Sequence, residues 1–145
     1  MLLILSFEDT IATDVGRHLG ADLRLVIASS DKGIDRAINY IAEQKPARVL
    51  ALGMYAGKDS AQCRLELSCS SRFRNQGTRK KWRLNSWLNS MTLKPANGMG
   101  NSWCNKLSYE VTRKYSQLPF SFVHIPKSYE VDKAVEEIQC AAVSS

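Results

Sequence analysis

Short apolar runs alternate with amphipathic segments along most of the chain. Runs of strand length, rich in Leu, Ile, Val and Phe, occupy residues 2–7, 23–28, 48–53 and 120–125. Apolar positions with helical spacing predict helices over residues 11–19, 31–44, from 101 or 102 to about 115, and from 128 onward. Alternation of this kind indicates an α/β fold in which helices cover a sheet, with the strand at 48–53 in a central place.

Polar residues stand where the first helices would begin. Thr10 precedes the first helix, and Ser29 or Ser30 precedes the second. Hydroxyl side chains at such positions cap the free backbone N–H groups of a helix start. Gly20 is expected to stop the first helix, and Pro46 marks the break after the second.

The middle of the chain has a weaker pattern. Residues 63–69 alternate well enough for a strand, with Leu65 and Leu67 on one face. Polar, basic and aromatic residues then mix without a clear period. The expected elements are a long loop over 70–90 with one short helix near 82–88, a short strand over 91–94 and a turn over 97–100.

Length and composition fit one globular domain spanning residues 1–145. The chain has 145 residues, of which 44% are hydrophobic, so a disordered chain is not expected. No apolar run approaches the length of a membrane span. The first strand has no basic segment before it and is followed by Glu8 and Asp9, which is not the pattern of a signal peptide. We therefore expect a cytoplasmic protein without a membrane partner.

The cysteines and histidines argue against a metal site. The four cysteines, at positions 63, 69, 104 and 140, form no Cys-x-x-Cys pair. In the cytosol, reduced thiols are a simpler interpretation than disulfides. The histidines are His18 and His124 alone, so a histidine-rich metal site is not expected. The sequence predicts neither a metal nor a cofactor.

Positive charge gathers in one interval of the chain. The net charge is +6, and no Asp or Glu occurs between Glu66 and Glu110. The cations of that interval are Arg72, Arg74, Arg79, Lys80, Lys81, Arg83, Lys94 and Lys106. A solvated basic loop is the first interpretation, and an anionic ligand is the second. Nucleic-acid binding, with Phe73, Trp82 and Trp87 as stacking residues, ranks last because no nucleic-acid motif is present.

Two residues could form a catalytic pair. Cys104 falls in the first turn of a predicted helix, where unpaired N–H groups and the helix dipole favour thiolate over thiol. His124 falls near the C-terminal end of a predicted strand, at the edge where sites gather in open α/β sheets. A converging pair would supply a nucleophile and a general acid–base. A core cysteine and a structural histidine are the alternative, because sequence separation does not establish contact.

Five segments stand out along the chain. They are Ile4-Leu5-Ser6-Phe7-Glu8, the stretch 41–53 with its Lys45-Pro46 turn, Gly53-Met54-Tyr55-Ala56-Gly57-Lys58, Ser102-Trp103-Cys104-Asn105, and Phe122-Val123-His124-Ile125-Pro126. Together, and in this order, they resemble pyroglutamyl peptidase type I, the pyrrolidone-carboxylate peptidases. Cys-Asn at a helix start, followed by Phe-Val-His-x-Pro, carries most of the resemblance.

The resemblance implies a three-layer α/β/α fold with a mixed central sheet, of the phosphorylase/hydrolase-like kind. It also implies a metal-free, cysteine-type omega peptidase (a thiol protease) that removes N-terminal pyroglutamyl or related acyl groups from peptides. Cys104 would attack the carbonyl carbon and form an acyl-enzyme. His124 would deprotonate the thiol and then protonate the leaving amine.

The third catalytic position departs from the family pattern. Alignment from Gly57 places Arg64 where the family has a Glu that orients the histidine, and a cation there would repel an imidazolium. Glu66 lies two residues further along and shares a strand face with Arg64, a shift of about 7 Å that a bulge could absorb. Glu66 is therefore either the third catalytic residue or a surface carboxylate paired with a nearby Arg or Lys.

Substrate recognition departs further. Thr10 replaces the second aromatic residue that helps to sandwich the pyroglutamyl ring, although Phe7 remains. Met54 and Tyr55 stand where polar contacts to the lactam are expected. The resulting candidates for substrate binding are Phe7, Tyr55 and Arg74, the last of which matches an Arg near the family's site.

Two functions follow from these observations. The first is a cysteine hydrolase with a peptide or small acylated substrate. The alternative is a catalytically inactive relative that binds a small ligand or peptide, which Arg64 and the missing second aromatic favour. The actual substrate and the oligomeric state, a homo-oligomer included, stay open.

Overall fold

The computed structural model describes residues 1–57 and 62–143. The strands are β1 Leu2–Phe7, β2 Leu23–Ile27, β3 Arg48–Tyr55, β4 Arg64–Glu66, β5 Ser68–Ser70, β6 Lys81–Arg83, β7 Lys94–Ala96 and β8 Phe120–Pro126. The helices are α1 Ile11–His18, α2 Asp31–Gln44, α3 Trp103–Lys114 and α4 Val131–Val143. Lys58, in the expected glycine loop, lies outside the described residues.

A mixed sheet forms the middle layer. Within the described residues it has six strands in the order β2-β1-β3-β8-β4-β7. β2, β1, β3 and β8 are parallel, whereas β4 runs antiparallel to β8 and parallel to β7. β5 and β6 form a separate antiparallel pair.

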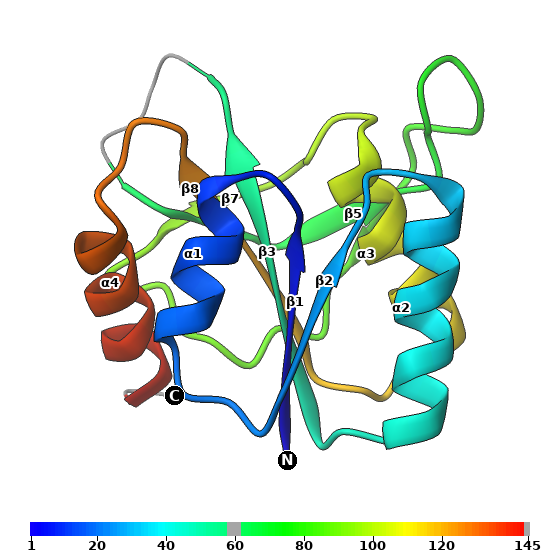
Figure 1. Ribbon diagram of the computed structural model, residues 1–145. Coiled ribbons are helices and arrows are strands. Elements are labelled where there is room, and N and C mark those ends of the chain that lie inside the picture. Colours follow the sequence, from blue (N-terminus) through cyan, green and yellow to red (C-terminus); the bar gives the residue numbers. More distant parts are fainter. Residues whose placement is uncertain (58–61, 144–145) are drawn as a thin grey trace.

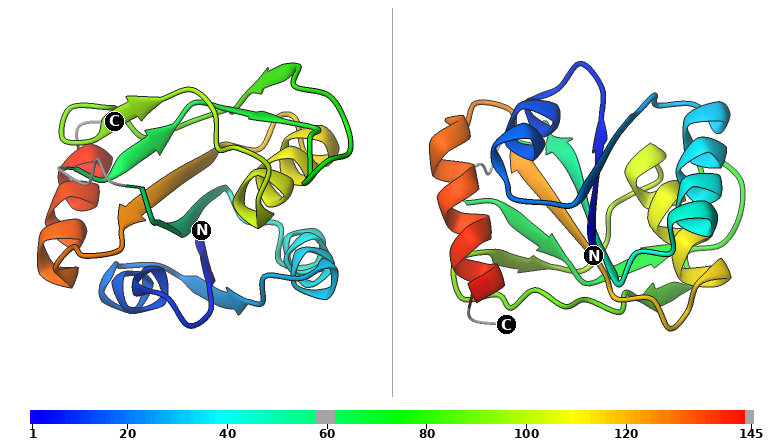
Figure 2. Two further views of the ribbon diagram at one scale, coloured as in Figure 1. Left: turned by 90° about the horizontal axis from the view of Figure 1, so that it is seen from above. Right: turned by 60° about the horizontal axis from the view of Figure 1, so that its bottom comes forward.

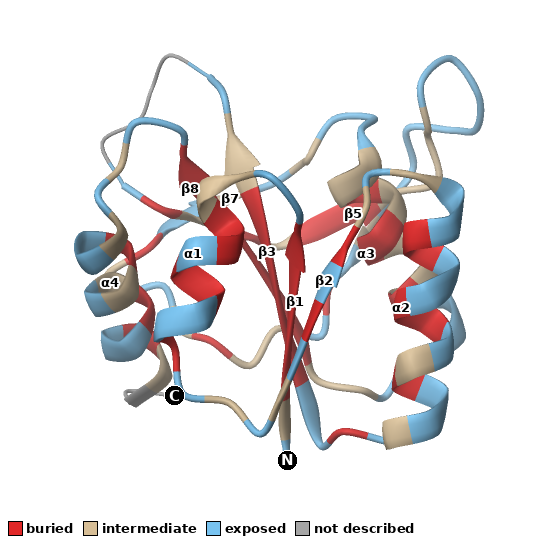
Figure 3. Cartoon of the chain, viewed as in Figure 1, coloured by how far each residue is buried: buried red, intermediate tan, exposed pale blue. Residues whose placement is uncertain are grey.

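Helices cover both faces of this sheet. α1 and α4 pack on one face, and α2 and α3 pack on the other (Figures 1 and 2). Successive residues of β3 alternate between the two cores, with Ala51 on the α2–α3 side and Leu52 on the α1–α4 side. Figure 3 shows the buried residues on the strands and on the helix surfaces that face them. The predicted three-layer α/β/α fold with a mixed sheet is confirmed.

Local signals position the first two helices as expected. The Thr10 side chain accepts a hydrogen bond from Ala12 N–H, and the Ser30 side chain accepts one from Gly33 N–H. α1 ends at His18 with Leu19 as an extended cap residue, so the helix stops before Gly20. α4 begins at Val131, later than the predicted start at residue 128.

The predicted strand over 63–69 is interrupted at Leu67. Its N–H donates to Ala96 O beside the main sheet, and its carbonyl accepts from Leu84 N–H beside the β5–β6 pair. β4 therefore belongs to one sheet and β5 to another. Leu65 lies in the α1–α4 core and Leu67 packs against it, whereas Cys69, beyond the break, lies in the α2–α3 core.

Two other expectations for the middle segment are wrong. No helix forms near 82–88, because Lys81–Arg83 is a strand that pairs with β5. The short edge strand lies at Lys94–Ala96 instead of 91–94, where it pairs with β4. In both cases hydrogen bonds to a strand that is distant in the sequence determine the element.

The helices of the described part of the chain are all too short or too polar to cross a membrane.

Candidate active site

The carboxyl ends of β1, β3 and β8 lie side by side at one edge of the sheet. Gly53 pairs with His124 in the β3–β8 register, and the β1–β3 register places Phe7 next to Gly53. On the other side of β8, Arg64 pairs with His124. Phe7, Gly53, His124 and Arg64 therefore form one row across four strands, on a single face of the sheet.

Cys104 reaches this row from α3, which packs on the same face. It is the second residue of α3, after Ser102 at the N-cap position. A Cβ atom on Gly53 would lie 2.7 Å from Cys104 Sγ and 3.0 Å from Phe122 Cζ. The missing side chain at Gly53 thus lets the helix start approach the sheet. The sulfur lies over the residue that pairs with His124, so Cys104 and His124 share one edge and one face.

Glu66 contacts the imidazole from the antiparallel strand. Its Oε1 lies 3.2 Å from His124 Nδ1, and the Glu66 side chain is 1% exposed. The β4–β8 register is regular, with Arg64 opposite His124 and Glu66 opposite Phe122. The carboxylate therefore reaches His124 along a diagonal of the ladder, a span that long side chains can bridge. No bulge is needed.

Known proteins match this chain in structure but not in sequence. No protein-family model matches the chain, and no curated protein sequence matches it. Solved structures match over nearly its whole length. The pyrrolidone carboxyl peptidase from Thermus thermophilus gives a TM-score of 0.79 at 15% identity, covering 97% of this chain and 98% of that chain. Pyroglutamyl peptidase I from Bacillus amyloliquefaciens gives 0.76 at 16% identity, with 99% and 93% covered.

The pyrrolidone carboxyl peptidase from Thermococcus litoralis gives a TM-score of 0.78 at 15% identity, covering 99% of this chain and 91% of that chain. The chain has the pyrrolidone carboxyl peptidase fold. At these identities the likeness is one of fold, and the chemistry has to be argued from this chain's own residues.

Arg64 does not disrupt the Glu66–His124 contact in this version of the pyrrolidone carboxyl peptidase fold. Its Nε lies 3.4 Å from Glu66 Oε1, the same oxygen that faces His124. Its guanidinium lies 4.4 Å from the centre of the Tyr55 ring, so its positive charge is directed toward an aromatic face. The interpretation of Glu66 as a surface carboxylate is wrong because the side chain is buried, although its pairing with an arginine is real.

Cys104 is a thiol rather than a thiolate at neutral pH. Burial raises the pKa of Cys104 to about 12, and the negative charge of Glu66 acts in the same direction. Hydrogen bonds from the Ser102 side chain and from the Cys104 backbone lower this pKa by less. The expected thiolate is therefore wrong for the resting protein, because desolvation outweighs the positive end of the helix.

The three candidates for substrate binding have different surroundings. Phe7 is 4% exposed and packs in the α2–α3 core. Tyr55 is half-buried, and its ring centre lies 6.3 Å from that of His124. Arg74 is exposed, and its guanidinium lies 5.7 Å from the Trp103 ring centre at the start of α3. Tyr55 is therefore the candidate beside the imidazole, and Arg74 lies at the helix start.

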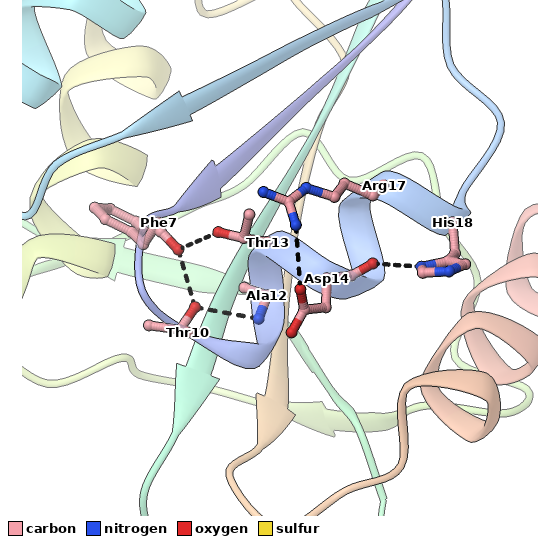
Figure 4. A network of polar contacts seen from close by, with 7 residues as sticks. All are labelled: Phe7, Thr10, Ala12, Thr13, Asp14, Arg17 and His18. Carbon is pink, nitrogen blue, oxygen red and sulfur yellow. Dashed lines mark hydrogen bonds and ion pairs between the residues drawn. The ribbon is translucent and has the colours of Figure 1, made fainter.

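Thr10 has a structural role at the turn between β1 and α1. Its hydroxyl donates to Phe7 O and accepts from Ala12 N–H, and the Thr13 hydroxyl donates to the same carbonyl (Figure 4). These bonds close the turn between β1 and α1. Thr10, which the resemblance aligns with the family's second aromatic, thus caps a helix in this chain.

Two residues of the site have roles that the sequence pattern did not indicate. Gly53 ends the strand expected over 48–53 and begins the glycine-loop motif, and it is also the contact point of the Cys104 sulfur. Asn105, 1% exposed, accepts from Ser70 N–H and donates to the carbonyls of Ser70 and Arg72. It therefore ties α3 to the chain after β5. The sequence signal for this role is that Asn105 directly follows Cys104.

No three His, Cys, Asp or Glu side chains in the described residues are grouped so that they could hold a metal ion.

Proposed function

We propose that this chain is a cysteine hydrolase that removes N-terminal pyroglutamyl or related small acyl groups from peptides. The observation that carries the proposal is the buried contact between Glu66 and His124, beside the place where Cys104 meets Gly53. A nucleophile, a base and a carboxylate that orients the base thus gather at one sheet edge.

Glu66 prepares the imidazole for proton transfer. With Nδ1–H donating to Glu66 Oε1, the other ring nitrogen, Nε2, carries the lone pair and serves as the base. His124 is buried, and such a contact holds both the tautomer and the ring orientation. Arg64 forms an ion pair with the same oxygen, at 3.4 Å from its Nε, and balances the carboxylate charge in the resting protein.

The reaction begins with proton transfer, because the resting nucleophile is a thiol. His124 Nε2 takes the proton of Cys104 as Sγ attacks the scissile carbonyl carbon and forms a C–S bond. The tetrahedral intermediate collapses with cleavage of the C–N bond, and His124 gives the proton to the leaving amine. Water, deprotonated by His124, then releases the acyl group from the thioester and restores the thiol.

The negative oxygen of the intermediate needs hydrogen-bond donors. Ser102 occupies the N-cap position of α3, and its side chain accepts no hydrogen bond from the backbone N–H groups of the first turn. The backbone N–H groups around Cys104 point out of the helix start and carry its positive dipole end. Donors of this kind contribute roughly 3–4 kcal/mol each to transition-state stabilisation in acyl transfer.

The test is turnover of pyroglutamyl 7-amido-4-methylcoumarin by the wild type, Cys104→Ala and Cys140→Ala. Cys140 is the exposed cysteine, on α4, so its variant controls for loss of a thiol as such. We expect the wild type and Cys140→Ala to release the fluorophore, and Cys104→Ala to lose at least about 10³-fold in rate. Equal rates for the wild type and Cys104→Ala would refute the hydrolase.

A second candidate function is binding of a peptide or small ligand without turnover. The raised pKa of Cys104 and the closeness of Arg64 to Glu66 favour it. This function predicts a measurable Kd for a pyroglutamyl peptide, no fluorophore release, and no acyl adduct on Cys104 by mass spectrometry.

A further inference from the structure

A cavity of about 340 Å³ lies beside the start of α3. Asn101 and Asn105, which flank Cys104 in the chain, both line it. Gly98 and Gly100, with φ of +124° and +75°, form part of the wall in the loop before the helix. Its volume is within the range of sites for small ligands or single side chains.

The charge of this cavity is positive. Arg72, Arg79 and Lys81 are among its lining residues, and no lining residue is an Asp or Glu. The ammonium group of Lys81 is held in place because it donates to Asn97 O at 2.9 Å. The absence of acids from residues 67–109 means that these cations have no carboxylate nearby in the chain. Such a cavity favours an anionic group.

Part of the cavity wall is fixed by burial, because Cys69 and Asn105 are buried, whereas the Arg79 and Lys81 side chains are exposed. Asn105 makes hydrogen bonds to the backbone of Ser70 and Arg72, which places Arg72 at the cavity. Phe73 packs on Trp103, with ring centres 4.6 Å apart, and so joins the following loop to the first residue of α3. Hydrogen bonds therefore hold the Arg72 backbone and the Lys81 ammonium group at the cavity, and Arg79 is exposed beside them.

The aromatic residues of the basic interval are engaged in packing. Besides the Phe73–Trp103 pair, Trp82 lies edge-on to Tyr109 with ring centres 5.3 Å apart. Trp87 donates from its indole N–H to Val49 O and lies under the Arg48 guanidinium. Each of these three candidate stacking rings is partly buried and already has a packing partner in the described structure, which argues against nucleic acid.

We propose that this cavity binds a carboxylate of the substrate on the leaving-amine side of the scissile bond. The inference rests on the proposed function, because it places the peptide across the α3 start with its acyl group at Cys104. It specifies the substrate class as acylated peptides with an acidic residue after the acyl group.

The experiment compares two peptides, pyroglutamyl-Glu-Glu and pyroglutamyl-Gln-Gln, which differ in charge but hardly in size. The proteins are the wild type, Arg79→Gln, Lys81→Gln and the control Lys32→Gln, an exposed lysine on α2 that loses the same charge elsewhere. We expect kcat/KM of the wild type to favour the acidic peptide about tenfold, the worth of one charge-assisted hydrogen bond. The preference should fall severalfold in the two cavity variants and stay in the control.

A binding measurement separates this inference from the proposed function. The Kd of both peptides is determined by calorimetry with Cys104→Ser, which needs no turnover. If the wild type is inactive but the acidic peptide binds preferentially through Arg79 and Lys81, the hydrolase fails and the cavity assignment holds. Equal binding of the two peptides, a preference unchanged in the cavity variants, or tighter and steeply salt-dependent binding of oligothymidine would overturn the cavity assignment.

Discussion

Glu66 Oε1 lies 3.2 Å from His124 Nδ1, although Glu66 is not the residue opposite His124 in the ladder. Arg64 holds that opposite position, and its guanidinium turns onto the Tyr55 ring. The contact with the imidazole is therefore made by the residue two positions further along β4. Side-chain length along a diagonal, and not strand register alone, determines which residue orients His124.

Replacing Glu66 tests this relationship. In Glu66→Gln the Arg64 charge loses its buried partner, so we expect the free energy of unfolding to fall by about 3 kcal/mol. If the chain is a hydrolase, kcat should fall by about 10²–10⁴-fold with little change in KM, because the imidazole loses its orienting charge. Urea denaturation and steady-state kinetics measure the two effects.

The matched control is Glu110→Gln, which removes a carboxylate from the exposed Glu110–Arg113 pair on α3. Exposed pairs of this spacing contribute about 0.5 kcal/mol or less. A loss of stability in Glu66→Gln no larger than in this control would contradict the buried ion-pair assignment.

Gly53→Ala tests the close approach of Cys104 to the sheet. The new methyl group would lie 2.7 Å from Cys104 Sγ, so either the helix start or the strand end has to move. We expect a loss of about 1–3 kcal/mol in the free energy of unfolding, together with a changed alkylation rate at Cys104. Gly20→Ala, where no atom lies within 4 Å of the added Cβ, should be neutral or stabilising by up to about 1 kcal/mol. Similar stability changes in the two variants would refute the contact.

Alkylation by iodoacetamide reports the protonation of Cys104. Because burial raises its pKa to about 12, the thiolate fraction is small at neutral pH. In a Cys140→Ser background, which removes the exposed thiol, the rate at Cys104 should rise about tenfold per pH unit between pH 7 and 10. Peptide mass spectrometry measures the site-specific rate. A plateau reached near pH 7 would instead indicate a preformed thiolate.

Stability should decline in alkaline solution. Burial raises the pKa of Cys69 from 9.0 to about 11 and that of Cys104 from 9.0 to about 12. Between pH 9 and these values the unfolded chain has released protons that the folded chain still holds, so the free energy of unfolding falls as pH rises. Below pH 9 both states hold the protons and the contribution is constant.

Urea denaturation midpoints at pH 8, 9.5 and 10.5 test whether the free energy of unfolding falls as the pH rises. Cys104→Ser removes one of the titrating thiols, so its midpoint should fall less steeply than that of the wild type. Identical slopes for the two proteins would show that the Cys104 thiol does not titrate above its unfolded value.

Much of the fold could be predicted from local pattern. β1 and β8 are mostly apolar, apart from Ser6, Ser121 and His124, and α2 combines an apolar stripe with a capping serine, so these elements match their predicted ranges within a residue or two. The short strands could be predicted only in part, since β4 and most of β5 fall in the strand expected over 63–69 and β7 lies close to the one expected over 91–94. Lys81–Arg83 has no apolar run and becomes a strand because β5 offers hydrogen-bond partners. Leu67 interrupts a good alternation because its two backbone groups bond to different neighbours.

Some features of the candidate site also follow from local sequence, and others do not. Cys104 at a helix start and His124 at a strand end follow from caps and apolar runs, which act over a few residues, and the sequence alone placed both. Four other features depend on which strands are neighbours and on how much water is excluded. They are the Glu66–His124 contact, the contact of the Cys104 sulfur with Gly53, the raised pKa of Cys104 and the basic cavity. Strand order and burial are properties of the whole packed chain, so only the tertiary structure could decide them.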